Sequence, residues 1–347
     1  MNNTGFTSLE RVLMTLGHKE PDRVPFFLLV NLHGARELGM SIEDYFSKAE
    51  NMAEGQIRMR ERYGHDCLYA FSYASIEHEA FGGKTLYFED GPPNAGTPVI
   101  HALDDINHIQ CPRIKDSPCL SKVLEATTIM KERIGDEAPI IGVTMSPFSL
   151  PVMQMGFEPY LNLILNSPDH LERLMVINEE FCVGWANAQL EAGATAICYF
   201  DPVSSSTVIT PEQYRQTGFK VAQRTLARIN GPTATHFASG RCLPVIEDVI
   251  NTKTNLLGIS VSEDLAEVKA AAAGRLTLFG NLNGVEMRRW TPEQTEEIVK
   301  EAISKGAIGG GFILADNHGE IPWQVPETVL EAIANAVHKW GRYPLDW

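Results

Sequence analysis

Short apolar, β-branched runs alternate with longer amphipathic stretches along the whole chain. Because these runs are apolar almost throughout, they are typical of parallel strands that helices cover on both faces. The intervening periodicity is helical, most clearly over Glu172–Glu191 and over Thr291–Ser304, which opens with a Thr-Pro-Glu start signal. Eight runs are predicted to be strands: residues 23–30, 67–71, 139–145, 195–200, 233–237, 256–261, 276–280 and 311–315.

Eight strands that alternate with helices over this length predict an α/β protein with a (β/α)8 (TIM) barrel. We expect residues 1–347 to form a single barrel domain, since no linker divides the chain. A helical extension over Ser8–Leu16 precedes the first strand and is predicted to cover the bottom of the barrel. The stretch 82–99, with its Gly-Pro-Pro turn, is predicted to be a hairpin inserted after the second strand, over the barrel mouth.

Polar residues follow the strands, and the carboxyl ends of all barrel strands meet at one mouth. Helix caps and polar loops also occur there in any α/β protein, so Ser262 and Asp316 fit a capping role as well. His236 differs because it lies within a strand, where a histidine needs a partner or a metal. We interpret Cys242 as the apolar start of the next helix. The polar positions include Asn31, His33, Tyr73, Asp201, His236, Glu263, Asn281, Asp316 and His318.

Composition and charge narrow the class of partner. The formal net charge is −15 and no run of lysine and arginine reaches five residues, which argues against nucleic acid and anionic membranes. The chain shows no signal-peptide pattern and no apolar stretch of spanning length. Six scattered cysteines without a CxxC pair indicate reduced thiols, so we expect a cytoplasmic protein. A homodimer is the default expectation for its assembly.

Several segments, in order, resemble the uroporphyrinogen decarboxylase superfamily. They are RVLMTLGHKEPDRVPFF (11–27), FDPVSSSTVITPEQY (200–214), TATHFASG, LLGISVSEDLAEVKAA, LTLFGNLNG and GGGFILADNHGEIPWQVP. The resemblance spans nearly the whole chain and implies a (β/α)8 barrel with a cleft at its C-terminal face. The superfamily contains true decarboxylases and cobamide-dependent methyltransferases.

The decarboxylase pattern is incomplete in this sequence. Its Arg-Gln-Ala-Gly-Arg segment is replaced by NLHGAREL (31–38), and the Asp of its Phe-Ser-Asp motif is replaced by Tyr73. The resemblance therefore favours the methyltransferase branch, whose thiol-methylating members bind zinc through a His-x-Cys and a later Cys. Here His236 is kept, Ala238 and His318 stand at the cysteine positions, and Glu263 matches a glutamate after the sixth strand.

This comparison implies a candidate metal set of His236, Glu263 and His318, since two histidines and a carboxylate form a known zinc site with an open position. The alternative is acid/base chemistry without metal, with Asp316 and His318 handling the proton. Asp201 and Asn281 are expected to orient the substrate or His236. Asn31, His33 and Tyr73 are expected to shape the substrate pocket.

The resulting hypothesis is transfer of a methyl group from a small methylated substrate, for example a methoxylated one, to the cobalt of a corrinoid protein. The chain has no Asp-x-His-x-x-Gly motif, so the cobamide is expected to arrive on a partner protein or free. Three alternatives stay open: a methylcobamide:thiol methyltransferase, a lyase or decarboxylase of a small acid, and a binding module without catalysis.

Overall fold

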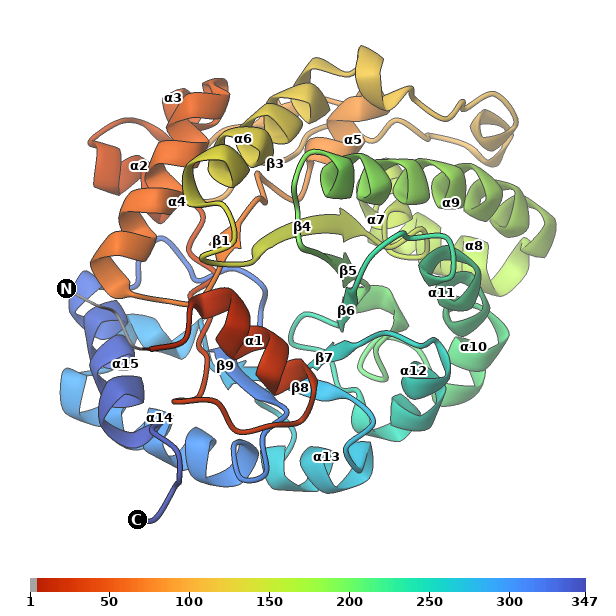
Figure 1. Ribbon diagram of the computed structural model, residues 1–347. Coiled ribbons are helices and arrows are strands. Elements are labelled where there is room, and N and C mark those ends of the chain that lie inside the picture. Colours follow the sequence, from red (N-terminus) through yellow and green to blue (C-terminus); the bar gives the residue numbers. More distant parts are fainter. Residues whose placement is uncertain (1–4) are drawn as a thin grey trace.

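The structure is a computed structural model that describes residues 5–347. Its centre is a curled parallel sheet of seven strands in the order β1-β4-β5-β6-β7-β8-β9 (Figure 1). The predicted α/β class is therefore confirmed, and seven of the eight expected strands are present in their predicted order. The seven strands are β1 (Leu68–Tyr69), β4 (Ile140–Met145), β5 (Ala196–Phe200), β6 (Thr233–His236), β7 (Leu256–Gly258), β8 (Thr277–Leu282) and β9 (Phe312–Asp316).

The first expected strand, residues 23–30, is extended chain with one parallel bridge, Phe26 to Leu314. It still lies between the two outer strands, because Phe27 N donates to Leu314 O at 2.8 Å and Asp66 N donates to Phe26 O at 2.8 Å. A regular ladder is interrupted for a local reason. Pro25 has no N–H, and the Phe26 N–H is taken by the Asp66 carboxylate at 3.0 Å. The curled sheet is thus bridged into a TIM-barrel-like ring.

The helices lie around the outside of the sheet (Figure 1). The expected helices 172–191 and 291–304 are present as parts of α9 and α14, and Thr291 caps α14 by accepting from Gln294 N. The helices are α1 (Ser8–Leu16), α2 (His33–Leu38), α3 (Ile42–Ser47), α4 (Ala49–Tyr63), α5 (Ile76–Ala80), α6 (Pro118–Ile134), α7 (Pro151–Met155), α8 (Phe157–Asn166), α9 (Pro168–Glu191), α10 (Pro211–Gln216), α11 (Gly218–Leu226), α12 (Ile246–Asn251), α13 (Leu265–Ala272), α14 (Pro292–Gly306) and α15 (Glu327–Trp340).

The sheet encloses an apolar interior that alternate strand residues fill, as the two-residue period of a strand requires. α1 lies across one end of this ring, in front of the strands in Figure 1, and its Val12 packs against the interior cluster. That cluster contains Val12, Phe27, Leu29, Cys67, Tyr69, Val143, Cys198, Ala234, Leu256, Phe279, Ile313 and Ala315.

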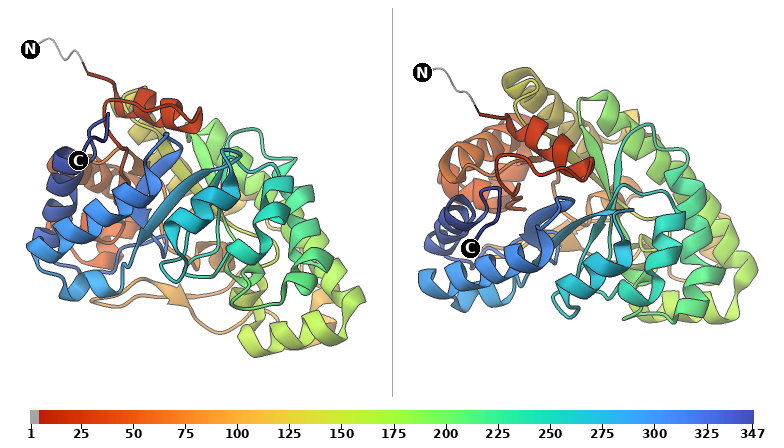
Figure 2. Two further views of the ribbon diagram at one scale, coloured as in Figure 1. Left: turned by 90° about the horizontal axis from the view of Figure 1, so that it is seen from below. Right: turned by 60° about the horizontal axis from the view of Figure 1, so that its bottom comes forward.

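A short hairpin, β2 (Thr85–Leu86) with β3 (Asn94–Ala95), follows β1 within the stretch expected to form one. In the left view of Figure 2 it lies on the side of the molecule opposite α1. Its turn reaches the segment after β9, where Gln324 Nε2 donates to Asp90 O at 2.7 Å. The hairpin therefore lies over the ends of the strands that carry the candidate chemistry.

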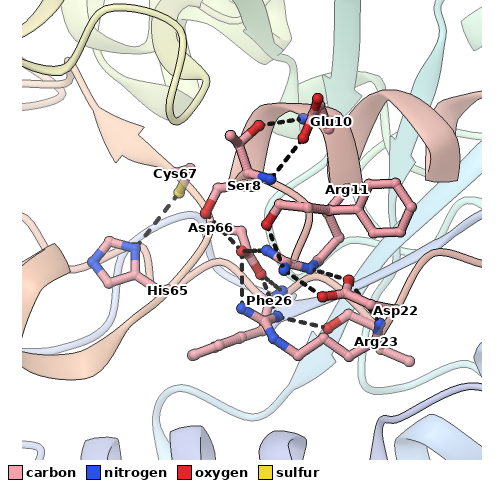
Figure 3. A network of polar contacts seen from close by, with 12 residues as sticks. Ser8, Glu10, Arg11, Asp22, Arg23, Phe26, His65, Asp66 and Cys67 are labelled. Carbon is pink, nitrogen blue, oxygen red and sulfur yellow. Dashed lines mark hydrogen bonds and ion pairs between the residues drawn. The ribbon is translucent and has the colours of Figure 1, made fainter. Parts of the chain in front are cut away.

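An ion cluster ties α1, the extended segment and the start of β1 together (Figure 3). Asp66 is fully buried and accepts from Arg11 at 2.7 Å and from Arg23 at 2.6 Å. Ser8 Oγ donates to the same carboxylate at 2.9 Å, and Arg11 also pairs with Asp22 at 2.7 Å. Because each buried charge has several partners, the cluster stabilises the place where the extended segment 23–30 closes the ring.

None of the helices within residues 5–347 combines the length and apolar character that crossing a membrane would need.

Replacing Asp66 by Asn should lower the free energy of unfolding by about 3–5 kcal/mol, because two buried guanidinium groups lose their shared counter-charge. Urea unfolding followed by circular dichroism measures this loss. Asp22→Asn is the matched control. It also removes a partner of Arg11, but its side chain is 37% exposed, so we expect a loss of at most about 1 kcal/mol. Equal losses in the two variants would contradict the role given to the cluster.

Candidate active site

Strands β1 and β4 separate at the mouth of the ring. They pair at only two positions, Leu68 with Ile140 and Tyr69 with Ile141. The last ladder bond between them joins Ala70 N to Ile141 O at 2.9 Å. Beyond this point β4 continues to Met145 without β1 beside it. The backbone groups of β4 that face the opening need other partners, since unpaired buried amides are costly.

Side chains from two helices supply those partners. Gln189 of α9 accepts from Val143 N and donates to Val143 O, both at 2.9 Å, as a neighbouring strand would. Glu77 of α5 accepts from Met145 N through both carboxylate oxygens, at 2.9 and 3.1 Å. Gln189 and Glu77 therefore replace the missing strand and keep the wall of the ring open here.

A cavity of about 130 Å³ fills this opening. Its floor and walls come from β1, β4, the end of β5, α6 and α9, and the loop after β9 closes one side. Most of the lining is apolar, and no lysine or arginine is part of it. The polar and aromatic lining residues are Tyr69, Phe71, Ser72, Tyr73, Glu77, Trp185, Gln189, Phe200, His318 and Glu320.

Burial disfavours the charged form of both glutamates of the cavity. Burial raises the pKa of Glu77 to about 8, although the Met145 N–H lowers it somewhat. Burial also raises the pKa of Glu320 to about 8, with Asp316 adding repulsion. Glu320 Oε1 is buried and has no hydrogen-bond partner. The cavity thus holds two carboxylic acids that are mostly protonated near neutral pH.

Asp316 organises the loop after β9. Its Oδ2 accepts from His318 N at 2.7 Å and from Gly319 N at 2.9 Å, and Tyr69 OH donates to Gly319 O at 2.9 Å. Its Oδ1 is buried without a partner, and burial raises its pKa to about 6. Asp316 and Tyr69 together hold His318 and Glu320 against the cavity.

His236 lies behind the cavity rather than in its lining. Its ring packs between Phe200 and Phe279, at centroid distances of 5.3 and 5.1 Å. Nδ1 accepts from Ala238 N at 2.8 Å, so the neutral ring carries its hydrogen on Nε2, which is buried without a partner. Burial, with a smaller repulsion from His318, lowers its pKa to about 3.

The expected metal set does not assemble. Glu263 accepts from Cys242 N at 2.9 and 3.0 Å and from Leu243 N at 2.7 Å, so its oxygens serve the loop before α12. In its tautomer, Nε2 of His236 has no lone pair to give. Residues 5–347 contain no group of three histidine, cysteine, aspartate or glutamate side chains placed to hold a metal. His236, Glu263 and His318 therefore do not fit zinc as they lie here.

Asp201 faces away from the cavity, because its neighbour Phe200 points inward. Its Oδ1 accepts from Ser146 Oγ at 2.5 Å and from Ser149 Oγ at 2.7 Å. Burial raises its pKa, and the serine hydroxyls oppose that shift. The carboxylate therefore joins the loops after β4 and β5.

The other expected residues are spread around the mouth. Tyr73 lines the cavity and donates to Glu79 at 2.8 Å. The Asn31 amide donates to Ser72 O, next to that lining, and so orders the chain after β1. His33 is buried near Trp323, with a pKa lowered to about 3 by burial and by Arg36.

Asn281 lies in a separate groove between the loops after β7 and β8. Its amide donates to Ser260 O at 3.3 Å and to Glu263 O at 3.4 Å. Of the expected site residues, only Tyr73 and His318 line the cavity itself.

Glu77 and Glu320 were not expected from the sequence. Glu320 stands in the segment ADNHGEIPW, two residues after His318, and Glu77 follows FSYASI. No sequence signal marks either one, because other polar residues stand beside both. Their role depends on the side-chain direction of a loop and of a short helix, which periodicity does not provide.

Comparison with known proteins identifies the relatives of this site. Residues 7–340 match the uroporphyrinogen decarboxylase (URO-D) family. The chain belongs to this family. Over 355 residues, 96% of each chain, it is 23% identical to a uroporphyrinogen decarboxylase from Idiomarina loihiensis. Over 216 residues, 61% of this chain and 62% of that protein, it is 30% identical to the methylcobamide:CoM methyltransferase MtaA from Methanosarcina barkeri.

The fold of this URO-D family member also has a solved counterpart. A methyltransferase structure from Methanosarcina mazei superposes with a TM-score of 0.87 over 96% of this chain and 99% of that one, at 22% identity. The resemblance inferred from the sequence segments is confirmed. The family's relatives include both decarboxylases and methyltransferases, so membership alone does not choose between these two activities.

The raised pKa of Glu77 predicts how stability depends on pH. The unfolded carboxyl ionises near its ordinary value of 4.5, whereas the folded one ionises near 8. The stabilising contribution is therefore complete below about pH 4.5 and is lost as the pH rises to about 8, at up to about 1.4 kcal/mol per pH unit. Glu77→Gln cannot ionise, so its melting temperature relative to wild type should increase between pH 5 and pH 8.5.

Thermal melts across this pH range test the prediction. Glu125→Gln, which removes an exposed glutamate of α6, is the matched control and should track wild type. A constant difference between Glu77→Gln and wild type over the whole range would show that Glu77 is not held protonated.

Proposed function

We propose that this protein is a corrinoid-dependent methyltransferase that moves a methyl group from a small methylated compound to the cobalt of a corrinoid carried by a partner protein. The observation that carries the proposal is the charge of the cavity. It is lined by two buried carboxylic acids and by no lysine or arginine. The similarity to a protein named as a methylcobamide:CoM methyltransferase supports the same activity.

The alternative within the family is decarboxylation of uroporphyrinogen, a substrate with many carboxylates. Such a substrate needs cationic side chains around it, because a buried carboxylate without a counter-charge is strongly unfavourable. The acids of this cavity and the net charge of −15 oppose its binding. A small methylated compound with an apolar surface suits the lining better.

The residues present would act on such a compound by position and by exclusion of water. The apolar walls keep water from the reacting methyl group, and the rings hold its carbon in line for displacement. A reduced corrinoid supplies the nucleophile as a second substrate. His318 and Glu320, which follow Asp316 in the same loop, line the cavity beside the leaving group. Either side chain could donate a proton to that group. His236 acts as a positioning residue through Phe200.

Zinc is not part of this proposal. Glu263 is committed to backbone amides, and the His236 nitrogen that faces away from Ala238 carries a hydrogen. The partner corrinoid protein is proposed from the relatives, and the methyl donor from the chemistry of the cavity.

A methyl-transfer assay tests the proposal directly. Cob(I)alamin mixed with the protein and a panel of methoxylated, methylthio and methylated ammonium compounds should yield methylcobalamin, seen in the cobalt absorption spectrum, with at least one class. With a methoxylated donor, whose leaving oxygen needs a proton, His318→Ala should lower kcat/KM at least tenfold, as loss of one positioned acid or base does. Glu89→Gln on the exposed hairpin should leave the rate unchanged.

An assay of the reverse reaction, demethylation of methylcobalamin by a thiol, distinguishes the proposed direction of methyl transfer from that of a thiol methyltransferase. If methylcobalamin is demethylated by thiols while no donor methylates cob(I)alamin, the protein is a thiol methyltransferase. If neither reaction occurs and uroporphyrinogen is decarboxylated, the proposal is wrong.

A further inference from the structure

Aromatic rings dominate the lining of the cavity between β1 and β4. Five of them come from four different parts of the ring wall: Tyr69, Phe71, Tyr73, Trp185 and Phe200. Tyr69 and Phe71 contact each other with ring centroids 5.4 Å apart. Rings gathered around one small space attract cations through their negatively charged faces.

The acids of the cavity add to this attraction. Glu320 Oε1 is buried and unpartnered, so it is free to face a ligand. Glu77 is 3% exposed, and burial raises its pKa to about 8. A cation entering the cavity would supply the counter-charge that these carboxyl groups lack, and it would favour their ionised forms. An uncharged ligand would offer them nothing of this kind.

The chemistry of methyl transfer agrees with a cationic donor. When cobalt(I) attacks the methyl carbon of a quaternary ammonium ion, the carbon–nitrogen bond breaks and its electron pair stays on nitrogen. The cobalt–carbon bond forms from the electron pair of cobalt, and the amine departs neutral. This step requires no proton and no Lewis acid, whereas an ether must lose an alkoxide.

We infer that the methyl donor is a small methylated ammonium ion, which the aromatic rings and Glu320 of this cavity bind as a cation. The inference rests on the proposed function and narrows its substrate class. It assigns Glu320 and Phe71 to substrate recognition.

Binding by isothermal titration calorimetry tests this without any turnover. The probes are choline and 3,3-dimethylbutan-1-ol, which has the same shape but carries a carbon in place of the charged nitrogen. Wild type should bind choline about tenfold more tightly than its neutral isostere. Glu320→Gln should remove most of this preference. Phe71→Leu keeps an apolar side chain but removes the ring, and it should weaken choline severalfold while the isostere is unaffected.

Glu89→Gln is the charge control, because it removes an exposed carboxylate of the hairpin and should keep the preference for choline. Circular dichroism confirms that each variant is folded. Equal affinity of wild type for the two probes would overturn the inference. A preference that survives unchanged in both Glu320→Gln and Phe71→Leu would also overturn it, and the wild-type comparison stands even if a variant fails to fold.

Failure of this inference and failure of the proposed function give different results in the cob(I)alamin methylation assay. If cob(I)alamin is methylated by neutral methoxylated compounds but not by methylated ammonium compounds, the protein is a methyltransferase and the cationic donor is wrong. If no donor of any class methylates cob(I)alamin, the proposed function itself is wrong.

Discussion

The backbone of a buried strand must find hydrogen-bond partners along its whole length, and at β4 this requirement shapes the candidate site. β1 leaves the sheet after Ala70, while β4 continues to Met145. Gln189 and Glu77 bind the backbone groups of β4 that no strand pairs with. A side chain can bind these backbone groups from further away than a neighbouring strand can. Space therefore remains between β1 and β4, and the cavity occupies it.

The two ends of the ring differ in how many partners their buried carboxyl groups have. At the α1 end, Asp66 shares its charge among two arginines, a serine and a backbone amide. At the other end, buried carboxyl groups are left with few partners, as Glu320 and Asp316 show. Buried groups with incomplete partners lower stability but remain available to a ligand. The paired end provides the stability that the unpaired end lacks.

Much of this arrangement could be read from the pattern of apolar residues, and some of it could not. The strands were predictable because eight runs of the right length alternate with helical periodicity. The run 23–30 forms no regular strand because Pro25 lacks an N–H and Asp66, forty residues away, takes the Phe26 amide. Pro25 can be read from the sequence, but no local pattern signals the contact with Asp66.

Side-chain direction explains the mixed result at the site. The polar strand ends do gather at the mouth, yet adjacent strand residues point to opposite faces. Phe200 takes the inward position, so Asp201 turns outward to Ser146. Glu263 turns to the amides of Cys242 and Leu243, so the expected set of His236, Glu263 and His318 does not come together. Glu77 and Glu320 lie outside the strands, where alternation gives no rule, and only the structure places them together.

The position of the cavity has a consequence for the order of events in a two-substrate reaction. It lies between β1 and β4, with lining from α6 and α9. A small compound held between these strands leaves the mouth free for a much bulkier partner. In the methyl transfer proposed here, donor and acceptor would then occupy the protein at the same time without competing for one entrance. This layout favours a sequential kinetic scheme through a ternary complex over a ping-pong scheme with a modified enzyme.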